Sequence, residues 1–165
     1  MGFIMPCYLF TYHGYKTWLP DREEGFVEHH RQHNEPDLPL AIAYEMRSNE
    51  EVVLFDGRVQ KSIIDAVTEA QPHQALRLHF VATESTHAHV LVSWKDDERP
   101  WIKLRSGIKS SITRKLNASF ERRTWLNEGA SRRKVGNQEH YDYLVVTYLP
   151  SHRGWKWSED QGLFR

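Results

Sequence analysis

Three segments of the chain carry the hydrophobic spacing of helices. The first follows Gly57 and is expected to stop at Pro72, and its apolar residues are Val59, Ile63, Val67 and Ala70. The second begins at Pro100, where a missing N–H costs little, runs to about residue 120, and has an apolar side formed by Leu104, Ile108, Ile112 and Leu116. The third spans residues 137 to about 149 and contains Tyr141, Tyr143 and Tyr148.

Other segments alternate between apolar and polar residues, as strands do. Residues 6–11 predict a first strand, and residues 76–81 and 87–94, joined by a turn, predict a β-hairpin. Residues 52–55 form a short apolar piece that is either a strand or a lead-in to the first helix. A polar, basic connection over residues 125–134 could include a further strand.

Two segments show neither pattern. Residues 18–50 contain three prolines and a cluster of three histidines, and we expect a long irregular excursion there with surface positions for His29, His30 and His33. Residues 153–165 contain Trp155 and Trp157 and are expected to form a tail over the core.

The order strand, helix, hairpin, helix, helix predicts an α+β fold. We expect an antiparallel sheet of four to five strands, ferredoxin- or RRM-like, packed with helices. The 165 residues suit one domain, 1–165. The single cysteine, Cys7, fits a reducing compartment. No apolar run approaches the ~20 residues of a membrane span, and we expect no secretory leader, because no charged-then-apolar segment with a cleavage site opens the chain. A cytoplasmic protein without a membrane partner is therefore expected.

The charge of the chain is balanced as a whole but not in its parts, since 22 Lys and Arg offset 22 Asp and Glu. Residues 101–134 carry ten basic residues against two acidic ones, a net charge of +8, so the remainder sums to −8. Such a one-sided segment is expected of a phosphate-binding surface, although a solvated helix face gives the same pattern. The residues expected to contact nucleic-acid phosphates are Lys103, Arg105, Lys109, Arg114, Lys115, Arg132, Arg133 and Lys134.

The strand over residues 87–94 carries the clearest candidate chemistry. His87 and His89 point to one side because side chains alternate along a strand, and the opposite side is apolar, with Ala88, Val90, Val92 and Trp94. Two imidazoles on one side of a buried strand are spaced to hold a divalent metal. The simpler interpretation is two polar residues on the wet face of a sheet.

His152 is the candidate third ligand and lies four residues after Tyr148. If the last helix continues through this point, the two side chains share a face and offer a phenol and an imidazole to the two-histidine strand. Pro150 lies between them, however, and would remove a backbone hydrogen bond and kink the helix there.

These features together resemble the single-tyrosine HUH transposases, a family that includes the REP-associated tyrosine transposases and the short transposases of the smallest bacterial insertion sequences. The resemblance rests on the His-hydrophobic-His strand at residues 87–92, the basic helix that follows it and a late helical tyrosine. Residues 11–20 and 148–154 are also similar to signatures of one branch of the family. The resemblance spans most of the chain, although residues 21–55 contribute little.

The resemblance implies metal-dependent cleavage and strand transfer of single-stranded or hairpin DNA, as in DNA transposition or REP-element processing. Tyr148 would attack a phosphodiester and stay joined to the 5′ phosphate, with Tyr143 and Tyr141 as fallback nucleophiles. His87 and His89 on a central strand would hold Mg²⁺ or Mn²⁺. His152 stands where relatives commonly have Gln or Asn as a further ligand. A homodimer is possible, since relatives occur both as dimers and as monomers.

Two other interpretations fit the same residues. In the first, His87, His89 and His152 hold zinc and activate water, as in a metallohydrolase. In the second, the protein is a domesticated nucleic-acid-binding module that has no catalytic activity and needs no metal.

Overall fold

The structure is a computed structural model that describes five parts of the chain: residues 5–17, 26–27, 33–34, 51–96 and 98–165. Most of the excursion expected at residues 18–50, including His29 and His30, lies outside the described residues. Within it, strand β2 (Phe26–Val27) pairs with strand β3 (His33–Asn34) in a two-stranded antiparallel sheet.

The main sheet has six strands in the order β6-β1-β5-β4-β7-β8, and all of its pairs are antiparallel. The strands are β1 (Cys7–His13), β4 (Arg77–Thr83), β5 (His87–Ser93), β6 (Ser131–Lys134), β7 (Lys156–Ser158) and β8 (Gly162–Phe164). The first four of these strands and two helices follow the chain order β-α-β-β-α-β, which is the ferredoxin-like arrangement. The α+β prediction is therefore confirmed, and β5 lies inside the sheet.

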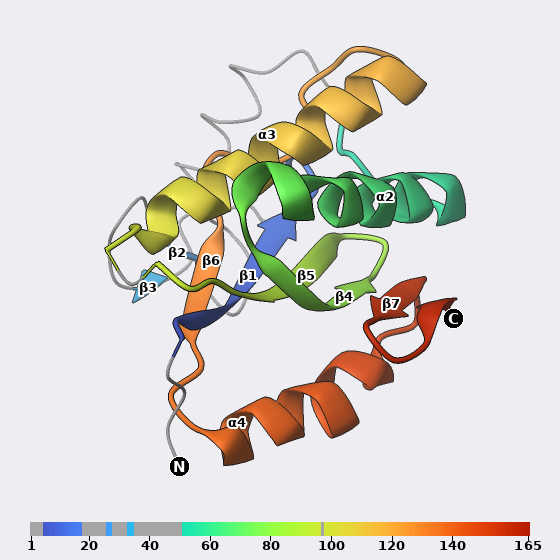
Figure 1. Ribbon diagram of the computed structural model, residues 1–165. Helices are drawn as coiled ribbons and strands as arrows, with labels where there is room; N and C mark the ends of the chain where they lie inside the picture. Colours follow the sequence, from blue (N-terminus) through green and yellow to red (C-terminus); the bar gives the residue numbers. More distant parts are fainter. Residues whose placement is uncertain (1–4, 18–25, 28–32, 35–50, 97) are drawn as a thin grey trace.

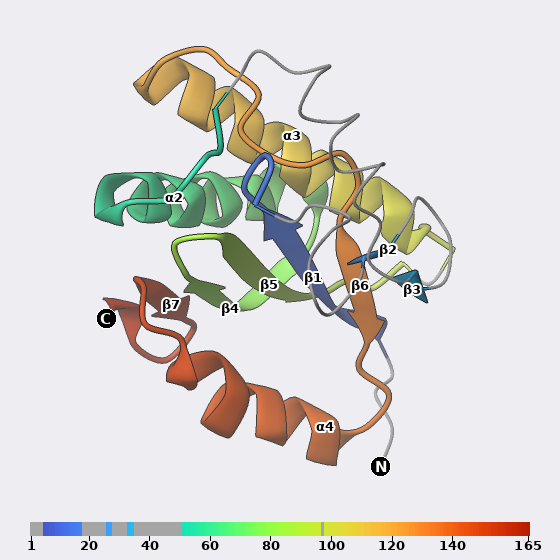
Figure 2. The same ribbon diagram turned by 180° about the vertical axis from the view of Figure 1, so that it is seen from behind.

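Helices cover both faces of this sheet. Helices α2 (Gly57–Gln74) and α3 (Trp101–Ser119) lie on one face, and α4 (Gln138–Tyr143) lies on the other (Figures 1 and 2). Each face has its own buried cluster, so the alternation along β5 sends Val90 and Val92 towards α2 and α3 and sends Leu91 towards α4. No helix among the described residues is long and apolar enough to cross a membrane.

The first helix does not stop at Pro72, as the sequence predicted, but continues to Gln74. The missing N–H of Pro72 removes only one hydrogen bond near the end of the helix, and the last turn is closed in another way. Ala75 adopts a left-handed conformation with φ of 49°, and the N–H groups of Ala75 and Leu76 both donate to the carbonyl of Gln71.

Strand β4 departs from the strict alternation expected at residues 76–81. A bulge at His79 shifts the pairing, because Leu78 lies opposite Val92 while Phe80 lies opposite Leu91. As a result Phe80 packs in the cluster under α4 rather than beside Leu78.

The C-terminal segment is not a tail over the core but the hairpin β7–β8, which extends the sheet beside β4. This hairpin brings the sheet to six strands instead of four or five. Its two strands have three residues each, which is too short for an alternation pattern to stand out in the sequence. Residues 52–55 are a lead-in, with Val53 and Phe55 buried and no strand assigned.

Candidate metal and tyrosine site

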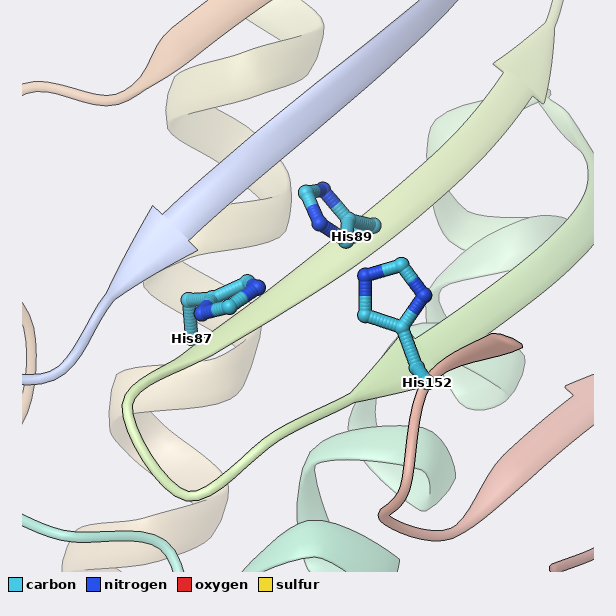
Figure 3. Close-up of side chains that lie close together, drawn as sticks. All are labelled: His87, His89 and His152. Carbon is cyan, nitrogen blue, oxygen red and sulfur yellow. The ribbon is translucent and has the colours of Figure 1, made fainter. Parts of the chain in front are cut away.

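Three histidines from two distant parts of the chain converge on the α4 side of the sheet. His87 and His89 project from β5, and His152 projects from the segment after α4 (Figure 3). Their candidate ligand atoms all lie within 4.8 Å of one another. The ring centroids are 4.8 Å apart for His87 and His89 and 4.6 Å apart for His89 and His152. These three residues could hold a metal ion.

The hydrogen bonds of the rings orient them as metal ligands usually are oriented. Nδ1 of His152 lies 3.2 Å and 3.1 Å from the backbone carbonyls of Tyr148 and Leu149. Carbonyl oxygens only accept, so Nδ1 carries the proton and the lone pair of His152 is on Nε2.

Threonine hydroxyls hold the other two rings through the same atom. Nδ1 of His89 lies 2.7 Å from the hydroxyl of Thr11, and Nδ1 of His87 lies 2.9 Å from that of Thr86. A hydrogen bond at one ring nitrogen fixes the orientation of an imidazole and favours metal binding through the other ring nitrogen.

The surroundings of His89 favour its neutral imidazole, the form that binds metal. Burial, together with the neighbouring rings of His87, His152 and His13, lowers the pKa of His89 to about 2. His89 therefore keeps a lone pair at neutral pH, as a metal ligand requires. The donor set fits a divalent ion with a preference for nitrogen ligands.

Tyr148 lies beside this cluster. Its hydroxyl is 3.4 Å from Nε2 of His89, and its ring centroid is 5.1 Å from that of His152. Burial and the neighbouring Tyr143 raise the pKa of the Tyr148 phenol, while the positive charge of Arg133 lowers it. The raised pKa means that the phenol is protonated at neutral pH and needs activation to act as a nucleophile.

The chain between Tyr148 and His152 is not a continuous α-helix, the condition under which the sequence placed the two side chains on one face. A π-helical turn over Leu144–Tyr148 follows α4, and a 3₁₀ turn over Leu149–Ser151 ends the helix. Pro150 stands in the first turn of this 3₁₀ piece, a position at which proline is well tolerated. His152 follows the end of the helix and has an extended backbone, yet its ring still lies against that of Tyr148. Single π turns of this kind are frequent at functional sites.

The other two candidate tyrosines occupy different surroundings. The hydroxyl of Tyr141 lies 3.1 Å from Nδ1 of His79, in a network separate from the three histidines. Tyr143 is 53% exposed and stacks on Tyr148 with its ring. Of the three tyrosines, Tyr148 is therefore the one whose hydroxyl lies at the histidines.

The basic residues are not gathered at this site. The five on α3 belong to a helix that covers the opposite face of the sheet, and Lys115 forms an ion pair of 3.0 Å with Glu69. The five are Lys103, Arg105, Lys109, Arg114 and Lys115.

Strand β6 sends its basic residues to both faces of the sheet. Arg133 lies opposite Leu9 of the α4 cluster and close enough to Tyr148 to influence its pKa. Arg132 and Lys134 lie opposite Phe10 and Tyr8, which face α2 and α3. Eight basic residues were expected to bind phosphates. Of these, Arg133 is the one that these contacts place on the Tyr148 side of the sheet.

Sequence reasoning missed two residues of the site, Thr11 and His13. Both lie on β1, two residues apart, so their side chains point to the same face of the sheet. In the pairing of β1 with β5, Thr11 lies opposite His89 and His13 lies opposite His87. The ring of His13 lies 5.8 Å from that of His87. The two-residue spacing was visible in the sequence, but the pairing of β1 with β5 was not.

Hydrogen bonds of its backbone N–H and C=O groups fix the loop that carries His152 to the sheet. The N–H of Gly154 donates to the carbonyl of Thr83, and the buried ammonium of Lys156 donates to the carbonyl of His152 at 2.6 Å. A Cβ on Gly154 would overlap the carbonyl and hydroxyl oxygens of Thr83. A glycine is therefore required for this close approach.

Comparisons with known proteins give a fold likeness without a sequence family. No family model matches the sequence, and no curated protein matches it. Among solved structures, the chain is similar to that of a REP-associated tyrosine transposase bound to a REP hairpin, with a TM-score of 0.47 and 11% identity. The match covers 87% of this chain and 64% of the other, so this chain spans less than two thirds of that protein. At this identity the likeness concerns the fold alone.

Proposed function

We propose that the protein cleaves and rejoins single-stranded DNA through a covalent 5′-phosphotyrosine at Tyr148, with a divalent metal at His87, His89 and His152. Such strand transfer serves DNA transposition or the processing of REP-like elements. The observation that carries the proposal is the position of the Tyr148 hydroxyl, 3.4 Å from Nε2 of His89 in the three-histidine cluster.

The reaction conserves the energy of the phosphodiester. The Tyr148 oxygen attacks phosphorus and loses its proton, while the bond from phosphorus to the 3′ oxygen breaks and that oxygen takes up a proton. The products are a 5′-phosphotyrosine and a free 3′-OH. Attack of another 3′-OH on the phosphotyrosine reverses the step and restores the phenol, so rejoining needs no ATP.

The three imidazoles suit a transition ion better than Mg²⁺, because Mg²⁺ prefers oxygen ligands. Of the two ions expected from the sequence, Mn²⁺ therefore fits the donor set better. When bound, the ion would polarise the scissile phosphate and stabilise negative charge on its oxygens. Nε2 of His89, the atom that would bind the ion, is also the neighbour of the Tyr148 hydroxyl, which supports attack beside the ion.

Arg133 supplies the protein's own positive charge on the same side. Its guanidinium lowers the pKa of Tyr148 and so favours the phenolate, and it can pair with a phosphate oxygen in the charged transition state. Arg133 is exposed, which leaves it accessible to a bound strand.

The test is formation of a covalent adduct. Protein incubated with hairpin or single-stranded DNA and Mn²⁺ should give a complex that survives a denaturing gel and is absent with a chelator. Tyr148→Phe should abolish it, and Tyr143→Phe, which keeps the stacked ring and removes only its hydroxyl, should retain it. The absence of any adduct under these conditions would overturn the proposal.

A second function is favoured by the number of imidazoles. Three histidines and an open position are the ligand pattern of catalytic zinc sites, which activate water for hydrolysis. A zinc hydrolase would cleave DNA or another substrate without an adduct, and Tyr148→Phe would leave its activity in place. The same gel, with product analysis, separates the two functions.

A further inference from the structure

We infer that the edge of the sheet at β6 binds the continuation of the DNA strand, on the face opposite Tyr148, through a platform formed by Trp101, Arg132 and Lys134. The inference rests on the proposed function and extends it. A strand held at Tyr148 on one face would pass around β6 and contact this platform on the other.

The platform is a stack of rings capped by a guanidinium. Arg132 lies over the ring of Trp101 at 4.2 Å from its centroid, and Arg105 lies 5.1 Å from the same ring. Behind Trp101 is Tyr8, with nearly parallel rings at 6.2 Å, and Tyr8 in turn stacks on Trp94 at 5.4 Å. Stacking holds the exposed guanidinium of Arg132 in one orientation and leaves its outer side to solvent.

The charges at this platform repel one another. Arg105 and Arg132 are close enough that Arg132, together with burial, lowers the pKa of Arg105. Lys134 lies opposite Tyr8 and adds a third positive charge on the same face. Among the described residues, none of the three cations Arg105, Arg132 and Lys134 forms an ion pair with a carboxylate. Binding of a polyanion would relieve this repulsion and release counterions.

The arrangement of β6 connects the two faces. Arg133 points to the Tyr148 side, and its two neighbours in sequence, Arg132 and Lys134, lie on the platform side. Among the described residues, β6 is one of the two edge strands of the main sheet, and we infer that a nucleic-acid chain passes from one face to the other around it. Only a flexible single strand can turn so sharply, because duplex DNA has a persistence length of about 50 nm. Unpaired bases can also stack on a guanidinium or an indole.

The test measures noncovalent binding by the Tyr148→Phe protein, which forms no adduct. Fluorescence anisotropy compares an oligonucleotide of about 4 nucleotides, sufficient for one face, with one of about 16 nucleotides that extends in both directions. We expect Arg132→Gln to weaken binding of the long oligonucleotide about tenfold, to reduce its salt slope by about 1, and to leave the short one unchanged.

The matched control is Lys61→Gln on α2. It removes an exposed cation whose Nζ lies 4.3 Å from the ring centroid of Trp155. It should change neither affinity. Equal behaviour of Arg132→Gln and Lys61→Gln on the long oligonucleotide would overturn the inference. Tighter binding by Arg132→Gln would also overturn it.

The outcomes for the platform and for the proposed function are distinguishable. An adduct at Tyr148 together with unchanged binding by Arg132→Gln would refute the platform alone. Platform-dependent binding without an adduct would refute the chemistry alone.

Discussion

The hydroxyl of Thr11 lies 2.7 Å from Nδ1 of His89, across the pairing of β1 with β5. His89 is the most enclosed of the three histidines that could hold a metal ion, and this bond leaves its Nε2 directed at the hydroxyl of Tyr148. A residue on a neighbouring strand thus determines how the central histidine can act.

Replacing Thr11 by valine keeps the shape of the side chain and removes its hydroxyl. Because the bond orients His89, Thr11→Val should weaken Mn²⁺ binding by about 10- to 100-fold. Isothermal titration calorimetry on metal-free protein measures the change. Thr68→Val, which removes a hydroxyl that bonds to the Asp65 carbonyl on α2, is the control. Equal affinities for the two variants would contradict a role of Thr11 at the metal site.

The buried, neutral His89 should make stability depend on pH in the metal-free protein. Its folded pKa of about 2 lies below the usual 6.5, so below pH 6.5 only the unfolded chain gains this proton. The stabilisation is complete above pH 6.5 and is lost as the pH falls towards 2. The free energy of unfolding should decrease by about 2 kcal/mol from pH 6.5 to 5 for this group alone.

Urea denaturation at several pH values in the presence of a chelator measures this slope. His89→Gln should flatten it, whereas His73→Gln, which removes an exposed histidine at the end of α2, is the matched control. A slope that is the same in His89→Gln and in the unmodified protein would show that His89 is protonated in the folded state.

The close approach of Gly154 to Thr83 should make this position sensitive to a single methyl group. Gly154→Ala would push the loop away from β4 and move His152 from the other two histidines, since the backbone carbonyl oxygen and the hydroxyl of Thr83 block the new Cβ. We expect at least a tenfold loss of Mn²⁺ affinity, with a stability loss of about 1–3 kcal/mol. Gly136→Ala is the control, because a Cβ there meets nothing within 4 Å. Unchanged metal binding in Gly154→Ala would mean that the loop tolerates the shift.

Arg133 should matter for the rate of cleavage more than for binding. Its guanidinium favours the Tyr148 phenolate and faces the site of charge development, so Arg133→Gln should slow adduct formation about 10- to 100-fold at saturating DNA. Single-turnover kinetics on gels give the rate. Arg122→Gln removes an equally exposed arginine beyond the end of α3 and should leave the rate unchanged. A loss confined to DNA affinity would assign Arg133 to binding alone.

Local patterns were sufficient to predict some parts of this molecule. The alternation on β5 correctly placed His87 and His89 on one side and the apolar residues on the other, and the spacing of α3 correctly marked its buried side. Both predictions depend only on the spacing of residues within one strand or helix, which can be read from the sequence.

Other parts depend on contacts between distant segments, and the sequence did not reveal them. The bond of Thr11 to His89 requires the register between β1 and β5 to be known. The charge run at residues 101–134 looked continuous, but α3 and the alternation of β6 distribute it over two faces. The short hairpin β7–β8 has too few residues to show a pattern, although it follows the loop that carries His152.

The most direct test of the central claim is mass spectrometry of the covalent complex formed with single-stranded DNA and Mn²⁺. After protease and nuclease digestion, we expect one modified peptide, with a nucleotide joined through its 5′ phosphate to Tyr148. We also expect that chelation of the metal prevents this modification. Attachment to Tyr141 or Tyr143, or cleaved DNA without any modified peptide, would contradict the central claim.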